Sequence, residues 1–172
     1  PKSVCTSINN EVCHGIPDKN IILEEGDIIN VDVSTILDGY FSDASRMFKM
    51  GKVSERAERI VRVTEECVKL GLEAAKPWGH LGDIADAINS HAQANGYSVV
   101  EDIGGHGVGL EFHEEPFVSY VTPKGSEMLL VPGMIFTIEP MINEGSPDFF
   151  VDEDNDWTVY TIDDGLSAQI EY

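Results

Sequence analysis

The sequence predicts an α+β domain in which two helices cover one face of an antiparallel sheet. β-like runs occupy most of the chain before residue 50, segments of helical periodicity follow between residues 54 and 95, and strand and turn signals dominate from Val99 onward. Helices that are grouped in sequence, rather than alternating with strands, favour antiparallel strand pairing. The length of 172 residues is that of one domain, which we expect to span residues 1–172.

The first predicted element is a β-hairpin. Residues 28–33 and 40–45 are β-like runs, and the Asp38-Gly39 dipeptide between them is typical of a two-residue turn. This turn would place Leu37 opposite Tyr40. Counting outward from that pair predicts the register of the whole hairpin.

That register brings two acidic side chains together. Ser34 lies opposite Asp43, so Asp32 points to the same face and is the diagonal neighbour of Asp43. Two carboxylates at this distance repel each other unless a cation lies between them. Two solvated aspartates on an exposed face are the commoner arrangement for such a pair taken alone. Here the flanking apolar residues predict a largely buried hairpin, in which unpaired charge is costly. These residues are Ile28, Val31 and Val33.

Two helices are expected next. Ser54 is a suitable N-cap for a helix that runs to Ala75 and carries apolar residues at i, i+3 and i+4 spacing. Pro77-Trp78-Gly79 ends this helix. A second helix begins near Leu81 and stops at Asn95-Gly96, a typical C-terminal signal.

Composition narrows the classes of partner and the compartment. The net charge of −20 argues against binding to nucleic-acid phosphates and to anionic membrane surfaces. No apolar run approaches the length that spans a bilayer. The cysteines are odd in number, widely spaced and without a CxxC pair, which predicts a reducing cytoplasm rather than a disulfide framework. They are Cys5, Cys13 and Cys67.

One imidazole and four carboxylates form a candidate metal site, each in a β-like run. They are Asp32, Asp43, His106, Glu139 and Glu171. Such an oxygen-rich set holds more negative charge than one divalent ion needs, which favours two ions bridged by carboxylates. By ligand type, the candidate metals are manganese, iron, cobalt and zinc.

A second histidine follows the candidate ligand His106. His106 lies in the glycine-rich segment 104–109, and His113 comes seven residues later. An odd separation within one straight strand would place the two rings on opposite faces. The two histidines share a site only if the glycine-rich segment bends or bulges.

These candidates fall within five runs that match a known family in collinear order over essentially the whole chain. The runs are CTSINNEVCHGIP (residues 5–17), NVDVSTILDGYFSDASRMF (residues 30–48), GGHGVGLEFHEEP, MIFTIEPMI and SAQIEY. In these runs the chain resembles a type I methionine aminopeptidase. The resemblance implies a pita-bread fold, with residues 1–172 forming a single catalytic metallopeptidase domain. It also implies a metal-dependent exopeptidase that removes the initiator methionine from nascent chains.

The resemblance assigns roles position by position. It implies that the five candidate ligands hold two divalent metal ions and that His14 and His113 contact the substrate. It further implies a pocket for the methionine side chain, formed by Cys5, Phe112 and Trp157. One position departs from the family pattern, because the residue two past the first ligand is commonly threonine and is Ser34 here. Its hydroxyl still allows a hydrogen bond to a ligand.

The expected mechanism is attack of a hydroxide that bridges two divalent ions on the scissile carbonyl. His113 would stabilise the oxyanion, Glu139 would pass a proton to the leaving amine, and His14 would orient the scissile amide nitrogen. The expected partner is the N-terminal methionine of nascent polypeptides or peptides. Association with the ribosome is one option, and a monomer is the expected state.

Two alternatives stay open. One is a pita-bread binding module with impaired catalysis, against which the full set of ligands argues. The other is a proline-directed aminopeptidase of the same fold, against which the runs at residues 5–17 and 167–169 argue. Pro1 is not an initiator methionine and only Tyr172 follows Glu171. We therefore interpret the chain as an internal segment that lacks the family's N-terminal portion and extreme C-terminus.

Overall fold

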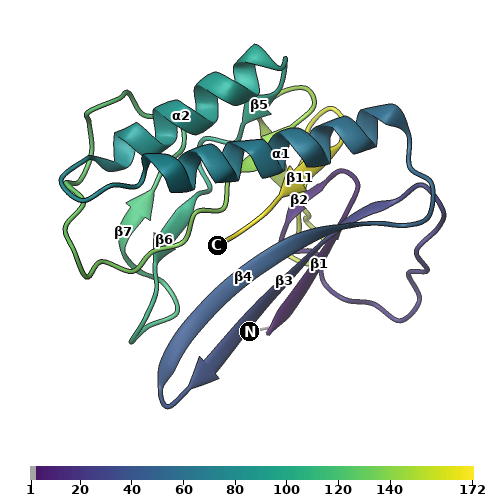
Figure 1. Cartoon of the computed structure of the whole chain (residues 1–172). Coiled ribbons are helices and arrows are strands. Elements are labelled where there is room, and N and C mark those ends of the chain that lie inside the picture. Colours follow the sequence, from purple (N-terminus) through teal and green to yellow (C-terminus); the bar gives the residue numbers. More distant parts are fainter. Residues whose placement is uncertain (1–2) are drawn as a thin grey trace.

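Two helices pack side by side over a group of antiparallel strands (Figure 1). The computed structural model describes residues 3–172. Its helices are α1 (Glu55–Ala74) and α2 (Leu81–Ala94), which confirms both expected helices and the α+β class. In chain order the strands are β1 (Val4–Ile8), β2 (Glu11–Cys13), β3 (Ile28–Leu37), β4 (Tyr40–Lys49), β5 (Ser98–Val99), β6 (Gly105–Gly107), β7 (Glu114–Val118), β8 (Met141–Asn143), β9 (Phe149–Val151), β10 (Val159–Thr161) and β11 (Ser167–Gln169).

The expected antiparallel sheet is divided into four short sheets within the described residues. Their strand orders are β1-β3-β4, β2-β10-β9, β11-β8-β5 and β6-β7, and every pairing is antiparallel. Register shifts between β2 and β10 and between β6 and β7 interrupt the pairing, as β-bulges do. The main hydrophobic core lies between the helices and these sheets, and its fully buried members include Ile60, Ile84, Ile88 and Ile142.

The β3–β4 hairpin has the predicted register. Leu37 pairs with Tyr40 and Ser34 pairs with Asp43, so Asp32 is the diagonal neighbour of Asp43. The turn residues have positive φ angles, 52° at Asp38 and 87° at the following glycine, as a two-residue turn of this kind requires.

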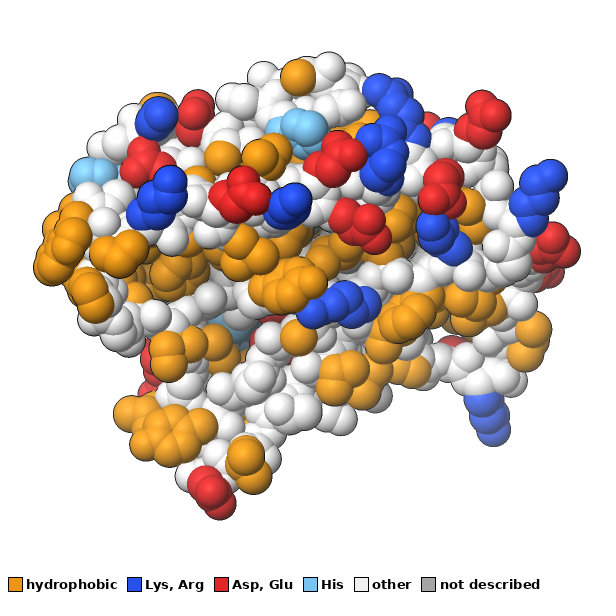
Figure 2. All heavy atoms as spheres, viewed as in Figure 1, with side chains coloured by type: hydrophobic (Ala, Val, Ile, Leu, Met, Phe, Trp, Pro, Cys, Tyr) orange, Lys and Arg blue, Asp and Glu red, His pale blue; other side chains and the backbone are white. Residues whose placement is uncertain are grey.

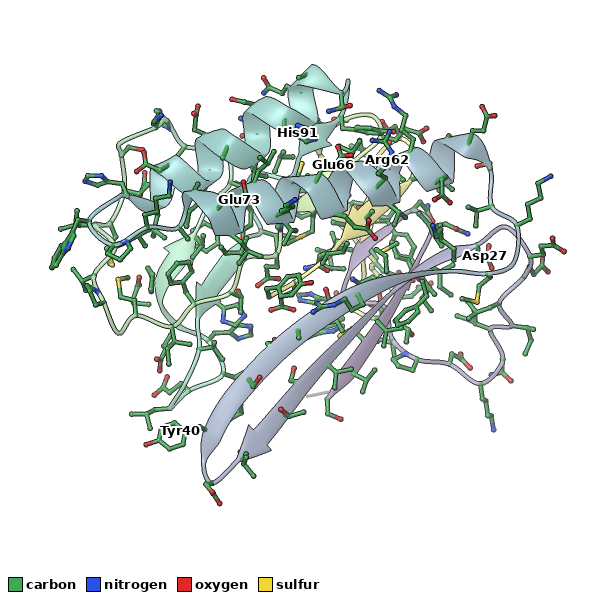
Figure 3. The ribbon with its side chains drawn as sticks, in the orientation of Figure 1. Asp27, Tyr40, Arg62, Glu66, Glu73 and His91 are labelled. Carbon is green, nitrogen blue, oxygen red and sulfur yellow. The ribbon has the colours of Figure 1, made fainter. Side chains whose placement is uncertain are left out.

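The prediction that this hairpin is largely buried is wrong for its outer half. Ile28 at the base is fully buried, whereas Val33 is 39% exposed and Leu37 is 77% exposed. The outer half projects beyond the helices and the other strands, and Tyr40 lies at its far end (Figures 1 and 3). Alternating apolar residues predicted the strands correctly but could not show that no second layer covers the tip.

Helix α1 begins as its sequence predicts and is linked to α2 along their exposed sides. The Ser54 hydroxyl accepts a hydrogen bond from the Ala57 amide at 3.2 Å, which satisfies one of the unpaired donors of the first turn. Glu66 on α1 contacts both Arg62 at 2.7 Å and His91 of α2 at 2.8 Å (Figure 3). The two helices therefore join through a polar surface link as well as through the core.

Two runs expected to be strands are irregular where they carry candidate ligands. Residues 134–139 form only an isolated bridge, between Phe136 and Gly107, and β11 ends before Glu171. The backbone around Glu139 divides its hydrogen bonds between two neighbours, since Thr137 donates to His106 and Ile138 exchanges two bonds with Tyr172. This divided pairing explains why the apolar run that ends at Glu139 does not form a regular strand.

We predict that Ser54→Ala lowers the free energy of unfolding by about 1 kcal/mol, because the first turn of α1 loses its side-chain cap. Ser54→Asp, which retains an acceptor oxygen, serves as the control and should retain most of the stability. Urea denaturation followed by circular dichroism would measure both variants. Equal stability of Ser54→Ala and the parent chain would show that this cap does not contribute.

Candidate active site

The five candidate ligands come together from separate parts of the fold. Asp32 lies on β3, Asp43 on β4 and His106 on β6, while Glu139 and Glu171 lie in the irregular segments described above. Single ligand atoms of Asp43, His106 and Glu171 all lie within 4.8 Å of one another. His106 Nε2 is 3.5 Å from Glu139 Oε1 and 4.0 Å from Asp43 Oδ2.

The His106 ring is oriented with one nitrogen toward these carboxylates. Its Nδ1 lies 2.9 Å from the Gly107 carbonyl oxygen, which accepts a hydrogen only if Nδ1 is protonated. In the neutral ring this tautomer leaves the lone pair of Nε2 facing Asp43 and Glu139. A backbone carbonyl that fixes the tautomer of a histidine in this way is typical of metal-ligating histidines.

Burial and mutual repulsion act together on the carboxylates. Loss of solvation raises the pKa of Asp32 and Glu171, and neighbouring carboxylates raise it further. Burial also raises the pKa of Glu139, with repulsion from Asp32 and Asp43 in the same direction. Within residues 3–172, none of these four acids forms an ion pair with Lys or Arg. Clustered carboxylates without a protein cation are suited to divalent metal ions.

Two unpaired carboxylate oxygens also indicate that this site is suited to metal ions. Asp32 Oδ1 and Glu171 Oε1 are buried and have no hydrogen-bond partner among the described residues. Glu171 as a whole is only 1% exposed, so water cannot readily replace the missing partner. A buried acceptor without a donor is costly, and a coordinated cation would satisfy both oxygens.

Uncharged side chains hold the candidate ligands in place. The Thr137 hydroxyl donates to Glu139 Oε1 at 2.6 Å, and Gln169 Nε2 donates to Glu139 Oε2 at 2.9 Å. The Ser34 hydroxyl donates to Asp43 Oδ1 at 3.0 Å, as expected from its place in the hairpin. The roles of Thr137 and Gln169 were missed from the sequence. Each lies two residues before a candidate ligand, a spacing that places both side chains on one face of an extended segment.

Arg46 fixes the chain end that carries Glu171. Its Nη1 donates to the carbonyl oxygens of Ser45 at 2.7 Å and Glu171 at 2.6 Å. The Arg46 guanidinium also lies 3.9 Å from the centre of the Tyr172 ring. Together with the bond from the Glu171 amide to the Ser45 carbonyl, these contacts hold Glu171 beside β4. The sequence alone gave no signal for this role of Arg46.

The five residues predicted to contact substrate line one cavity of 710 Å³ above the candidate ligands. They are Cys5, His14, Phe112, His113 and Trp157. On one wall the His14 ring stacks on Trp157, with 4.7 Å between ring centres and 20° between planes. On another wall Phe112 lies 4.2 Å from the ring centre of His113. A cavity of this size lies within the range of small-ligand sites, about 300–1,000 Å³.

The spacing of His106 and His113 is explained by a chain reversal. β6 and β7 form an antiparallel ribbon, and its register shifts next to His106. The loop between the strands carries His113 back to 4.3 Å from the His106 ring centre. Gly107 allows the backbone of β7 to lie close to β6, because a Cβ atom at this position would overlap the carbonyl oxygen of Glu115. The expected bend is therefore a chain reversal between two strands, and the pairing of these strands also has the register shift of a β-bulge next to His106.

The environment of the two cavity histidines favours their neutral forms. Burial lowers the pKa of His14, and the neighbouring His113 lowers it further. Burial likewise lowers the pKa of His113, with His106 acting in the same direction. A neutral imidazole both donates and accepts a hydrogen bond, which suits a side chain that contacts a peptide group.

Comparison with known proteins identifies the family to which this chain belongs. The model of metallopeptidase family M24 matches residues 1–172. Methionine aminopeptidase A of Synechocystis sp. is 54% identical over 172 residues, which cover all of this chain and 68% of that relative. The crystal structure of methionine aminopeptidase from Rickettsia prowazekii has a TM-score of 0.97 at 46% identity, covering all of this chain and 69% of that one. The chain belongs to metallopeptidase family M24.

Within this family the chain is similar to the methionine aminopeptidases, as its motifs predicted, and it has the pita-bread fold. A prolidase from Pyrococcus furiosus is less similar, with a TM-score of 0.77 and 25% identity over 99% of this chain and 44% of that one. The chain spans only part of the length of each relative. Family membership confirms the predicted hydrolase class and implies divalent metal ions. Within residues 3–172, neither helix has the length and apolar composition needed to cross a membrane.

We predict that Asp43→Asn weakens manganese binding at least about 100-fold, since changes that merely support a ligand cost about 10–100-fold. His113→Ala is the matched comparison, because His113 lines the cavity beside His106 without belonging to the ligand cluster. It should bind manganese as the parent chain does. Isothermal titration with manganese would measure both variants. Loss of metal from His113→Ala would show that His113 is itself a ligand.

We predict that His14 titrates below the ordinary value of 6.5 and that Trp157→Ala raises its pKa toward that value. Removing the stacked indole opens the His14 ring to water, which favours the charged imidazolium. NMR titration of the ring proton would measure the shift. Phe150→Ala is the control, because Phe150 stacks on Tyr160 rather than on a histidine. An unchanged His14 pKa in Trp157→Ala would assign the shift to other neighbours.

Proposed function

We propose that this cavity removes the N-terminal methionine from peptides and nascent proteins. The observation that supports this most strongly is the arrangement of one imidazole and four buried or half-buried carboxylates beside a cavity with aromatic walls. The names of the similar proteins point to the same reaction. The proposal assigns the floor of the cavity to hydrolysis and its walls to recognition of the side chain.

The metal would be held by the five candidate ligands. They are Asp32, Asp43, His106, Glu139 and Glu171. Four carboxylates balance the charge of two divalent ions, for which manganese, iron, cobalt and zinc are the candidates by ligand type. When bound, such a pair supplies Lewis acidity toward the scissile carbonyl and acidifies a water molecule.

Glu139 is the residue best placed to move the proton from water to the leaving amine. Its two carboxylate oxygens are held by Thr137 and Gln169, so it reaches the reaction centre in a fixed orientation. Burial raises the pKa of this carboxyl, whereas bound metal ions would favour its carboxylate form, which is the form that can accept a proton from water. His113 would donate a hydrogen bond to the carbonyl oxygen as charge develops there. His14 would orient the scissile amide nitrogen.

The methionine side chain would lie between Cys5, Phe112 and Trp157. These residues provide a thiol and two aromatic faces, and a flexible thioether makes favourable contacts with aromatic rings. Burial and the nearby Asp32 raise the pKa of Cys5 to about 11, so this thiol stays neutral in the pocket. An uncharged wall favours an uncharged side chain.

The cellular setting is also a proposal. All three cysteines are free, which agrees with a reducing cytoplasm. A monomer that acts on nascent chains, with contact to the ribosome as one option, is compatible with the proposed substrate. The net charge of −20 argues against direct binding to nucleic acid.

We predict that the metal-loaded chain cleaves Met-Ala-Ser and leaves Ala-Pro peptides intact, because its pocket residues suit an unbranched apolar side chain. His113→Ala should lower kcat about 100-fold without loss of metal, as expected for one hydrogen-bond donor to the oxyanion. Mass spectrometry of the products would follow both reactions. Cleavage of Ala-Pro instead would favour a proline-directed aminopeptidase, and inertness toward both would favour a binding module.

A further inference from the structure

Exposed carboxylates that the proposed reaction does not use line the active-site cavity, and their exposure places them at its mouth, whereas the candidate ligands are buried or half-buried. We refer to Asp102, Glu111, Glu114 and Glu115 as the acidic rim; all four line the cavity. No Lys or Arg lines it within the part of the chain that the structure describes. The cavity thus has negative charge at its mouth in addition to four of the five candidate ligands, which also line it: Asp32, Asp43, His106 and Glu139.

The acidic rim flanks strand β6, and His106 stands at the middle of that strand. Asp102 precedes β6, and Glu111 lies in the connection from β6 to β7. Glu114 and Glu115 are the first two residues of the neighbouring strand β7. A peptide that extends from the reaction centre along β6 therefore meets a carboxylate in either direction.

The negative charge continues outside the cavity. Asp102 also lines an adjoining groove of 140 Å³, together with Glu101, Asp148 and Phe149. The groove begins where the cavity ends, because Asp102 belongs to both. It offers a path for substrate residues beyond the first few, with two further carboxylates along it.

Basic side chains of the described chain lie elsewhere. Arg56 and Arg62 on α1 are paired with Glu144 and Glu66, and Lys49 is paired with an acid on α1. In Figure 2, Lys and Arg side chains gather over the helices. None of the ion pairs in residues 3–172 involves the acidic rim. The described residues therefore leave the charge of the acidic rim without a paired Lys or Arg.

We propose that the acidic rim selects substrates with positively charged residues after the scissile bond. This inference rests on the proposed function, in which two divalent ions offset the four carboxylates of the floor and leave the rim to set the field at the mouth. A cavity of 710 Å³ has room for residues beyond one methionine. A mouth lined by charge of one sign raises the encounter rate of oppositely charged ligands about 10-fold or more at low ionic strength.

The test compares three peptides on the metal-loaded protein. They are Met-Ala-Lys-Lys-Ser, Met-Ala-Ser-Ser-Ser and Met-Ala-Glu-Glu-Ser. At about 0.01 M salt, where the Debye length is about 30 Å, we expect kcat/KM to fall in that order, with the lysine peptide about tenfold above the serine peptide. At about 1 M salt, where the Debye length is about 3 Å, the three values should converge.

Two variants with equal loss of charge locate the effect. Asp102→Asn with Glu111→Gln removes rim charge at both ends of β6 and should reduce the ratio between the lysine and glutamate peptides. Glu114 is left intact, because its carboxylate accepts a hydrogen bond from the Glu111 amide. The control combines Glu65→Gln with Glu73→Gln, two exposed positions on α1, and should keep the ratio unchanged. Glu73 is labelled in Figure 3.

The outcomes separate this inference from the proposed function. Failure to cleave the serine peptide would contradict the proposed function alone. The inference would then be tested by the binding affinity of the labelled peptides, measured by fluorescence anisotropy. Tighter binding of the lysine peptide that is lost in the rim variant supports the rim in either assay. Equal values for all three peptides at low salt, or an equal loss in the control variant, would overturn it.

Discussion

Mutual repulsion between four carboxylates that share one poorly solvated space is the constraint on which this structure depends. Each of Asp32, Glu139 and Glu171 has a raised pKa, caused first by burial and then by its acidic neighbours. The described protein provides no Lys or Arg partner for any of the four. Grouping like charges in this way is unfavourable by itself and becomes favourable when a cation lies between them.

Neutral groups hold this arrangement without cancelling its charge. Thr137 and Gln169 donate to Glu139, and Ser34 donates to Asp43. The hydroxyl of the fully buried Tyr120 accepts a hydrogen bond from the Glu139 amide at 2.7 Å. The charged Arg46 donates to backbone carbonyl oxygens rather than to carboxylates. Hydrogen bonds from uncharged groups thus orient the carboxylates, while the negative charge of these carboxylates stays available for metal ions.

Local signals predicted local structure well. The Asp38-Gly39 turn correctly predicted the register of β3 and β4 and so the diagonal pair of aspartates. The Ser54 cap predicted the start of α1, and Asn95-Gly96 predicted the end of α2. Long-range relations were not accessible in this way. The segment before Glu139 divides its backbone hydrogen bonds between two neighbours, so its irregular form could not be predicted from periodicity. The exposure of the β3–β4 hairpin tip could not be predicted either, because it depends on the lack of a covering layer. Motif resemblance supplied what spacing could not, namely which distant residues belong together.

The dispersal of the site along the chain links metal binding to folding. Asn30 donates to the Gln169 carbonyl although the two residues are 139 positions apart, so this hydrogen bond joins the segment that carries Glu171 to β3. An unfolded chain therefore offers no preformed site, and any ion that binds must favour the native state. At a free ion concentration of 100 times Kd, such linkage adds about 2.7 kcal/mol to the free energy of unfolding. Availability of metal in the cell would then govern how long the folded protein persists as well as whether it reacts.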